Sequence, residues 1–106
     1  MRKITSLRRA ILGAEEGAVI YAQAPFSAES KAMRVKLDGD GYAPEGFEES
    51  AERRGFSLFL DADTVNELLD VAHDVRINKE QLVDLVLYYA EFREYPSWFH
   101  DLEVKD

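Results

Sequence analysis

Apolar residues gather in three short segments within the first 60 positions, and their residue types predict β-strands. Residues 18–22 form a β-branched run after Gly17. Residues 33–37 alternate apolar with basic side chains, which is typical of a half-buried strand. Residues 56–60 form a third apolar run after Gly55. These segments predict a three-stranded sheet.

Two later segments have the helical period instead. Asp61 or Asp63 is expected to cap the first helix. Asn78 is expected to cap the second, with Gln81 as its capping-box partner three residues on. The first helix has apolar residues at the i, i+3, i+4 and i+7 positions of one face: Val65, Leu68, Leu69 and Ala72. The second is apolar over more than half of its circumference, which predicts packing on two sides.

Shorter helices are expected at residues 6–12 and 44–54. Pro96 ends the helical region, so residues 95–106 are expected to form a C-terminal tail. The order α-β-β-α-β-α-α predicts an α+β fold with helices packed around a small three-stranded sheet. A chain of 106 residues has the size of one domain, so residues 1–106 are expected to form a single domain.

Charge is distributed unevenly along the chain. Residues 1–36 contain seven basic and three acidic residues, a net charge of +4. Residues 37–106 contain six basic and eighteen acidic residues, a net charge of −12. This asymmetry favours a basic protein partner, because a strong field of one sign steers oppositely charged molecules. The total of −8 argues against direct nucleic-acid binding.

Composition also limits the compartment. The chain has no cysteine, which excludes disulfides and thiolate chemistry and agrees with a reducing environment. No apolar run approaches the roughly 20 residues of a membrane span. We therefore expect a cytoplasmic protein that does not enter a membrane.

Much of the negative charge falls on one side of each long predicted helix. Four carboxylates of the first helix lie within an arc of about 60°, opposite its apolar face. They are Asp63, Glu67, Asp70 and Asp74. The second helix has a narrower stripe, formed by Glu80, Asp84 and Glu91. The acidic stripes have two possible interpretations: a surface presented to a basic partner, or the solvated face of any amphipathic helix.

Six of the twelve aromatic residues lie between positions 88 and 99. Tyr and Trp dominate binding hot spots because they bury large, rigid surfaces at low entropic cost. Tyr88, Tyr95 and Trp98 are therefore candidates for a partner interface, with burial under a folded-back tail as the alternative. The remaining three are expected in the core: Tyr89, Phe92 and Phe99.

The sequence contains no recognisable catalytic, cofactor or metal motif. His73 and His100 are its two histidines, and neither has a nucleophile or metal ligand at motif spacing. Residues 38–41 resemble the opening of a calcium loop, but Tyr42 and Ala43 occupy positions where a ligand and a glycine belong. We expect no cofactor, no bound metal and no enzymatic activity. A small His/carboxylate enzyme is the less favoured alternative.

The order of these motifs resembles that of a family of short acidic bacterial proteins of unknown function. The shared features are the early Ala18-Val19-Ile20-Tyr21 strand, the strand leading into Asp61-x-x-Thr64-Val65, and Leu85 to Tyr89 on the second long helix. The chain departs from that family at residues 39–45. In size and charge such proteins are similar to immunity proteins that neutralise bacterial toxins, which implies inhibition by binding and assigns no residue a role.

Together these features predict a non-catalytic, immunity-type inhibitor of a basic, nucleic-acid-directed toxin or enzyme. The seven striped carboxylates with Tyr88, Tyr95 and Trp98 would form its binding surface. The alternatives are a phage-type anti-defence (anti-CRISPR-like) inhibitor acting by nucleic-acid mimicry, and a structural homo-oligomer such as a dimer formed through the aromatic tail.

Overall fold

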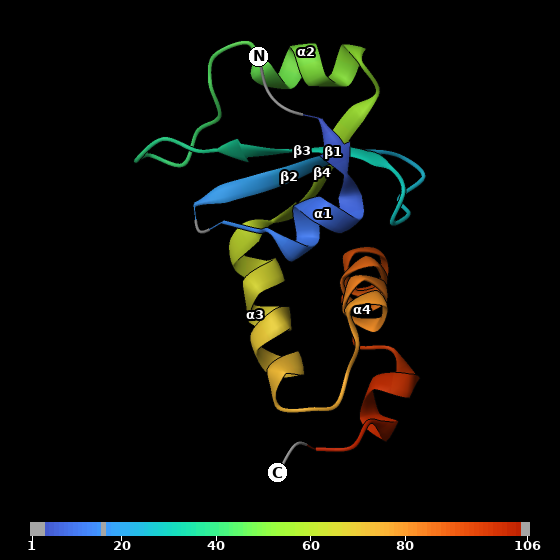
Figure 1. Ribbon diagram of the computed structural model, residues 1–106. Coiled ribbons are helices and arrows are strands. Elements are labelled where there is room, and N and C mark those ends of the chain that lie inside the picture. Colours follow the sequence, from blue (N-terminus) through green and yellow to red (C-terminus); the bar gives the residue numbers. More distant parts are fainter. Residues whose placement is uncertain (1–3, 16, 105–106) are drawn as a thin grey trace.

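The computed structural model describes residues 4–15 and 17–104, in which helices cover both faces of one sheet (Figure 1). The α+β class predicted from the sequence is confirmed. In chain order the elements are β1 (Thr5–Ser6), α1 (Leu7–Leu12), β2 (Ala18–Gln23), β3 (Lys31–Lys36), α2 (Phe47–Arg53), β4 (Phe56–Asp61), α3 (Ala62–His73), α4 (Lys79–Phe92) and the 3-10 helix η1 (Ser97–Asp101).

The prediction of a three-stranded sheet is wrong. The described part of the chain forms a four-stranded antiparallel sheet in the order β1-β3-β2-β4. The additional strand is β1, in which Thr5 pairs with Ala32 and Ser6 with Lys31. A strand of two residues is too short to show an alternating pattern of apolar and polar side chains. Ser6 also caps α1 by accepting a hydrogen bond from the backbone N–H of Arg9, so the sequence there predicted a helix alone.

The helix ends follow the predicted capping chemistry. Asp61, rather than Asp63, caps α3, because its carboxylate accepts the backbone N–H of Thr64 at 3.1 Å. At α4 the predicted capping box is confirmed: Gln81 N–H donates to the Asn78 side chain at 2.8 Å, and Asn78 N–H donates back to the Gln81 side chain at 3.0 Å. The helix expected at residues 44–54 is shorter than predicted.

The pleat of β2, one of the two inner strands, divides the core in two. Ile20 and Ala22 belong to a core shared with α1, α3 and α4, which lie below the sheet in Figure 1, whereas Tyr21 belongs to a core shared with α2, which lies above it. The lower core contains twelve buried residues, among them Leu7, Ile11, Phe59, Val65, Leu68, Val83 and Val86. The upper core is smaller and consists of Tyr21, Met33, Val35, Ala51 and Phe56.

The predicted tail folds back onto the two long helices. η1 contributes Phe99, 8% exposed, to a cluster with Ala72 of α3 and Leu85 of α4. The backbone N–H of Arg76 donates to the carbonyl of Glu103 at 2.7 Å, which holds the end of this segment beside the connection between α3 and α4. The aromatic end of the chain therefore closes the bottom of the molecule (Figure 1).

Replacing Phe99 with Ala tests this closure. Removing a buried aromatic ring should lower the free energy of unfolding by about 3 kcal/mol, measured by urea denaturation. Phe92→Ala is the matched control, because Phe92 lies seven residues earlier and is 51% exposed. Its effect should stay within about 0.5 kcal/mol. Equal losses in the two variants would contradict the packing described for η1.

Tyr21 is a titratable residue of the upper core, and its surroundings raise its pKa. Its ring meets Phe47 edge-on, with ring centroids 5.0 Å apart. Burial raises the pKa of Tyr21 above the ordinary value of 10.0, and the Glu48 carboxylate raises this pKa further. The folded state therefore disfavours the phenolate form.

This raised pKa predicts a loss of stability in alkali. The contribution of Tyr21 is fully present below the unfolded-state pKa of about 10 and is lost as the pH rises through the higher folded-state pKa. Urea denaturation between about pH 9 and pH 11 should show this decline, and Tyr21→Phe should reduce it. Tyr42→Phe, at a position 70% exposed, should leave the decline unchanged. The same decline in the Tyr21→Phe variant would refute the assignment.

Candidate functional site

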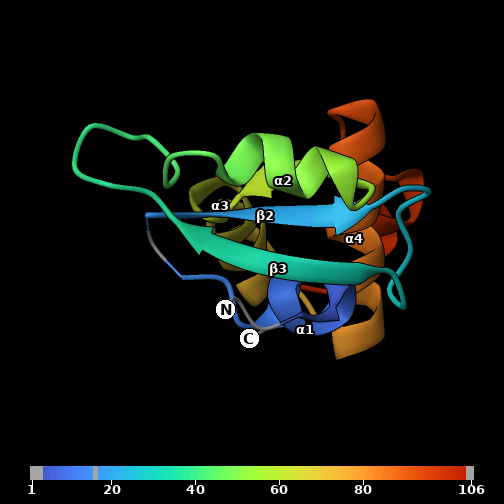
Figure 2. The same cartoon turned by 90° about the horizontal axis from the view of Figure 1, so that it is seen from above.

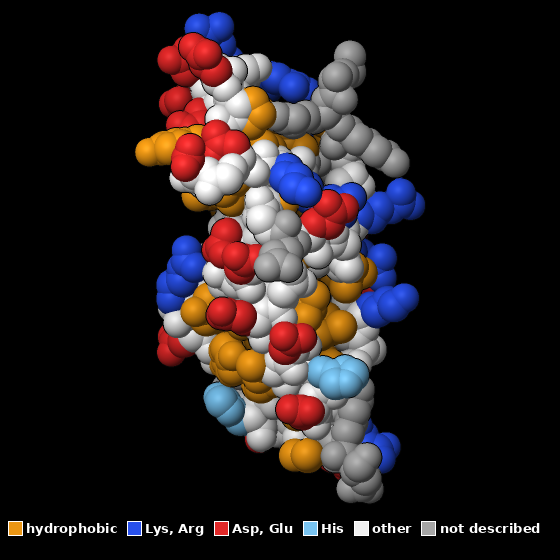
Figure 3. Space-filling model, turned by 90° about the vertical axis from the view of Figure 1, so that its left-hand side faces the viewer, with side chains coloured by type: hydrophobic (Ala, Val, Ile, Leu, Met, Phe, Trp, Pro, Cys, Tyr) orange, Lys and Arg blue, Asp and Glu red, His pale blue; other side chains and the backbone are white. Residues whose placement is uncertain are grey.

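The packing of α3 and α4 decides where the acidic residues point. α3 buries Ala62, Val65, Leu68 and Ala72 on one side, so the carboxylates on its opposite side face solvent. The structure leaves all seven predicted carboxylates exposed: Asp63, Glu67, Asp70, Asp74, Glu80, Asp84 and Glu91. On the side of the molecule where α3 lies, acidic and apolar side chains intermingle, while basic side chains lie toward the margins of its lower half (Figure 3).

One of these seven carboxylates is neutralised within the molecule. Glu80, in the first turn of α4, accepts hydrogen bonds from Arg8 of α1 at 2.9 Å to Nε and 2.5 Å to Nη2. Within residues 4–15 and 17–104, the other six have no ion pair. The α4 stripe predicted from the sequence is therefore divided, because Glu80 is paired with α1 whereas Asp84 and Glu91 are exposed and, among the described residues, have no ion pair.

Asp84, Tyr88 and Glu91 of α4 line a single pocket of about 540 Å³. Its opposite wall is the segment that follows β2, formed by Ala24, Pro25 and Phe26, and Leu87 and Ala90 complete the lining. The pocket thus combines apolar walls, a phenol ring and two carboxylates. We call it the α4 pocket.

Phe26 was not identified from the sequence. It lies in a connection with no regular pattern, and Pro25 before it signalled only the end of a strand. In the fold, the Phe26 ring packs edge-on against buried Phe59, with centroids 5.1 Å apart, and stays 38% exposed. Packing against a core residue fixes Phe26 as a wall of the α4 pocket.

Phe92 is the second difference from the sequence-based expectation. It was predicted to be in the core, but it is 51% exposed, and its ring lies 4.6 Å from that of Tyr88. Phe92 is the last residue of α4, and Arg93 adopts a left-handed conformation with φ 57° that turns the chain away. The tail then covers Tyr89 rather than Phe92.

Tyr95 and Trp98 have a different environment from Tyr88. The Tyr95 ring lies between those of Tyr89 and Phe99, at centroid distances of 6.0 and 5.1 Å. Trp98 is half-buried against the tail cluster. Neither lines the α4 pocket, so the structure does not bring these two residues together with Asp84, Tyr88 and Glu91. The burial of Phe99 is confirmed, and Tyr89 is half-buried.

The remaining candidate groups have ordinary surface surroundings. His73 and His100 are both exposed. The Asp38 carboxylate closes its own turn, accepting the backbone N–H groups of Asp40 at 2.9 Å and Tyr42 at 3.0 Å. In the described part of the chain, no three His, Asp or Glu side chains cluster as metal ligands. Within the same ranges, no helix has both the length and the apolar character needed to cross a bilayer.

Comparisons of the chain with protein-family models, with curated proteins and with solved structures found no match. The resemblance to immunity-type proteins consequently stays a prediction, and the site must be judged on its own geometry.

The acidic stripe of α3 should lower the stability of that helix. Glu67 has Asp63 four residues before it and Asp70 three residues after it, and like charges at these spacings repel. Glu67→Lys should raise the free energy of unfolding by about 0.5–1 kcal/mol, measured by urea denaturation. Glu67→Gln should give a smaller gain, and about 1 M salt should reduce both. A loss of stability in Glu67→Lys would mean that the stripe is not a source of repulsion.

Proposed function

We propose that this protein is a non-catalytic, immunity-type inhibitor that binds a basic, nucleic-acid-directed toxin or enzyme through the acidic surface of α3 and α4. The main support is the α4 pocket, in which Asp84 and Glu91 flank Tyr88 beside apolar walls. A cytoplasmic location is part of this proposal.

The lining of the α4 pocket matches the chemistry of an Arg or Lys side chain. The aliphatic stem of such a side chain would pack against Phe26 and Leu87, because long basic side chains bury their methylene groups readily. Its cationic end would pair with Asp84 or Glu91. The ring of Tyr88 offers an additional cation–π contact.

Binding of this kind would inhibit the partner enzyme by pairing with the basic side chains that it uses to hold nucleic acid. An enzyme that acts on nucleic acid holds the phosphate backbone with Lys and Arg side chains. A protein that places carboxylates against those cations competes directly with the nucleic acid. No chemical step by the inhibitor is needed, and neither histidine has a role in the proposal.

The carboxylates of α3 have a separate part in this proposal. Asp63, Glu67, Asp70 and Asp74 are exposed and have no ion pair among the described residues. Exposed charges of one sign chiefly accelerate association, whereas groups buried in a contact chiefly slow dissociation. The α3 stripe would therefore steer the basic partner, and the α4 pocket would hold it.

Charge reversal separates these two parts. The wild-type protein should capture a basic partner from a lysate of its source organism, after which surface plasmon resonance gives the rate constants. Asp84→Lys with Glu91→Lys should weaken binding by about 100-fold or more, mostly through faster dissociation. Asp70→Lys with Asp74→Lys should lower the association rate and flatten its salt dependence.

The matched control is Glu48→Lys with Glu49→Lys on α2, which changes the net charge by the same amount on the opposite side of the sheet. This control should bind nearly as tightly as wild type. If it weakens binding as much as the α4 variant, net charge rather than the α4 pocket governs recognition. Capture of no basic protein by the wild type would reject the proposed function.

A further inference from the structure

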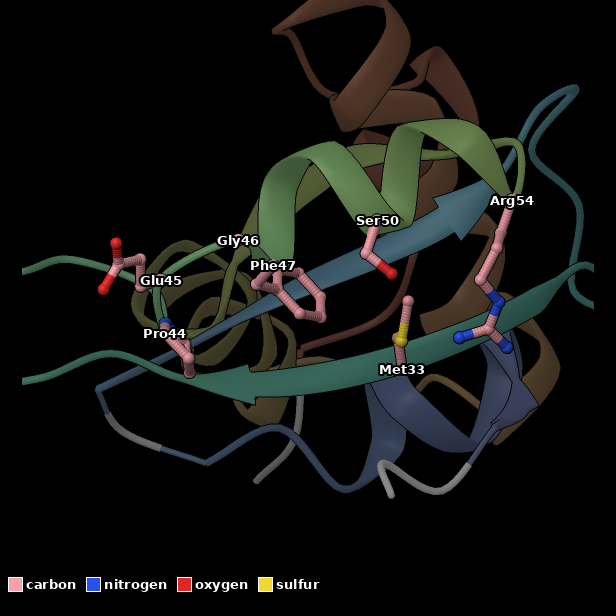
Figure 4. A pocket seen from close by; sticks show the side chains of 7 residues that line it. All are labelled: Met33, Pro44, Glu45, Gly46, Phe47, Ser50 and Arg54. Atoms are coloured by element: carbon pink, nitrogen blue, oxygen red, sulfur yellow. The ribbon is translucent and has the colours of Figure 1, made fainter.

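We infer that a second pocket, between α2 and β3 on the upper face of the sheet, binds a small amphipathic carboxylate: an apolar chain or ring that ends in one carboxylate group. This pocket, here called the α2 groove, has a volume of about 520 Å³. It is lined by Met33, Pro44, Glu45, Gly46, Phe47, Ser50 and Arg54 (Figure 4). The inference is independent of the proposed function, which concerns the opposite side of the sheet.

The α2 groove exists because one short helix covers the upper face. α2 has seven residues, and seen from above it lies along one side of that face, with β2 next to it and β3 beyond β2 (Figure 2). The side chain of Met33 rises from β3 into the space under α2, and the ring of Phe47 lies at the other side (Figure 4). Met33 is 1% exposed and belongs to the upper core, so the floor of the groove is apolar and fixed.

Two polar groups of the groove lie one helical turn apart. The Ser50 side chain points down from α2 into the groove, and Arg54, which ends the helix, extends toward β3 (Figure 4). Both residues are exposed, and among the described residues neither the Arg54 guanidinium has an ion pair nor the Ser50 hydroxyl a hydrogen-bond partner, so both donors are open to a ligand. Guanidinium groups bind carboxylates in a two-point, charge-assisted geometry, so this pair of donors suits a carboxylate.

The backbone of Arg54 is anchored, and its guanidinium lies near an aromatic ring. The Arg54 carbonyl accepts a hydrogen bond from the Gln23 side chain at 3.0 Å, which anchors the backbone to β2. The guanidinium carbon lies 5.5 Å from the ring centroid of Phe56, a cation–π distance. A restrained cation loses less entropy when it binds an anion than a freely moving one does.

The acidic residues near the groove determine which anions fit. Glu45 lies at the end of the groove remote from Arg54, and its carboxylate points away from Met33 and Ser50 (Figure 4). With Glu48 and Glu49 it lines a neighbouring pocket, so negative charge gathers beyond that end. A ligand with one carboxylate at Arg54 and an apolar remainder fits this arrangement, whereas a second carboxylate at the far end would be repelled.

Octanoate is a suitable probe, and Met33 is a built-in reporter. The chain has two methionines, so methyl-labelled methionine gives a two-signal spectrum in which Met33→Leu identifies the signal of Met33. Octanoate should shift the Met33 signal saturably, with a Kd on the order of 0.1–1 mM, as expected for a small ligand in an open groove. Octanedioate, of the same length with two carboxylates, and neutral octanol should each bind at least about fivefold more weakly.

Arg54→Gln should weaken octanoate binding about tenfold, and Ser50→Ala about threefold. Arg53→Gln is the matched control. Arg53 is exposed and adjacent in sequence but does not line the groove, so this variant should bind octanoate with unchanged affinity. Arg54→Lys keeps the positive charge but lacks the two-point donor geometry of the guanidinium, and it should give an intermediate affinity for octanoate. Near-ultraviolet circular dichroism confirms that each variant is folded.

Three results would overturn the inference. The first is the absence of a saturable Met33 shift up to about 10 mM octanoate, well above the expected Kd. The second is equal affinity for octanoate and octanol. The third is an equal loss of affinity in folded Arg53→Gln and Arg54→Gln variants. Because no outcome depends on a protein partner, failure here leaves the proposed function untouched, and failure of the proposed function leaves this inference untouched.

Discussion

The two-sided burial of β2 is the constraint on which the rest of the structure depends. β2 is hydrogen-bonded to β3 on one edge and to β4 on the other, so its backbone polar groups are paired along both sides. Its side chains are also apolar on both faces, in the run from Ala18 to Ala22. Helices are required above and below this strand to keep those side chains from water.

The unequal cover on the two faces follows from that constraint and determines where binding surfaces occur. Below the sheet, α1, α3 and α4 bury the larger core and η1 closes a second cluster with α3 and α4, and the polar sides of these helices form a broad outer surface. Above it, α2 alone covers a smaller core and leaves a groove beside β3. The lower surface is acidic around an apolar pocket, whereas the upper groove has a cation over an apolar floor. The two proposals therefore place ligands of opposite charge on opposite sides of one sheet.

The acidic residues affect stability and recognition in opposite ways. On α3, carboxylates four residues apart repel each other, as Asp63 and Glu67 do, and in the described chain neither has an ion pair that offsets this repulsion. On α4, the Arg8–Glu80 ion pair joins α4 to α1 and removes one charge from the available surface. Asp84 and Glu91 differ from the α3 carboxylates because they line a pocket, in which Phe26 and Leu87 provide apolar walls beside them.

Local patterns in the sequence were sufficient for most secondary structure and for the exposure of the acidic stripes. Capping residues such as Asn78 act within a single turn, and an amphipathic helix can bury just one side, so these features need no long-range information. Strand β1 could not be found in this way. Its two residues form a strand only because they pair with β3, some 25 positions away in the sequence.

The tertiary structure alone decided which acidic and aromatic residues belong together. Packing of the segment after β2 against α4 placed Phe26 beside Asp84, Tyr88 and Glu91, and the left-handed turn at Arg93 exposed Phe92 while directing Tyr95 and Phe99 inward. These outcomes depend on the direction in which loops leave their elements and on which surfaces then meet. Both are set by the global packing of the core and not by any local pattern.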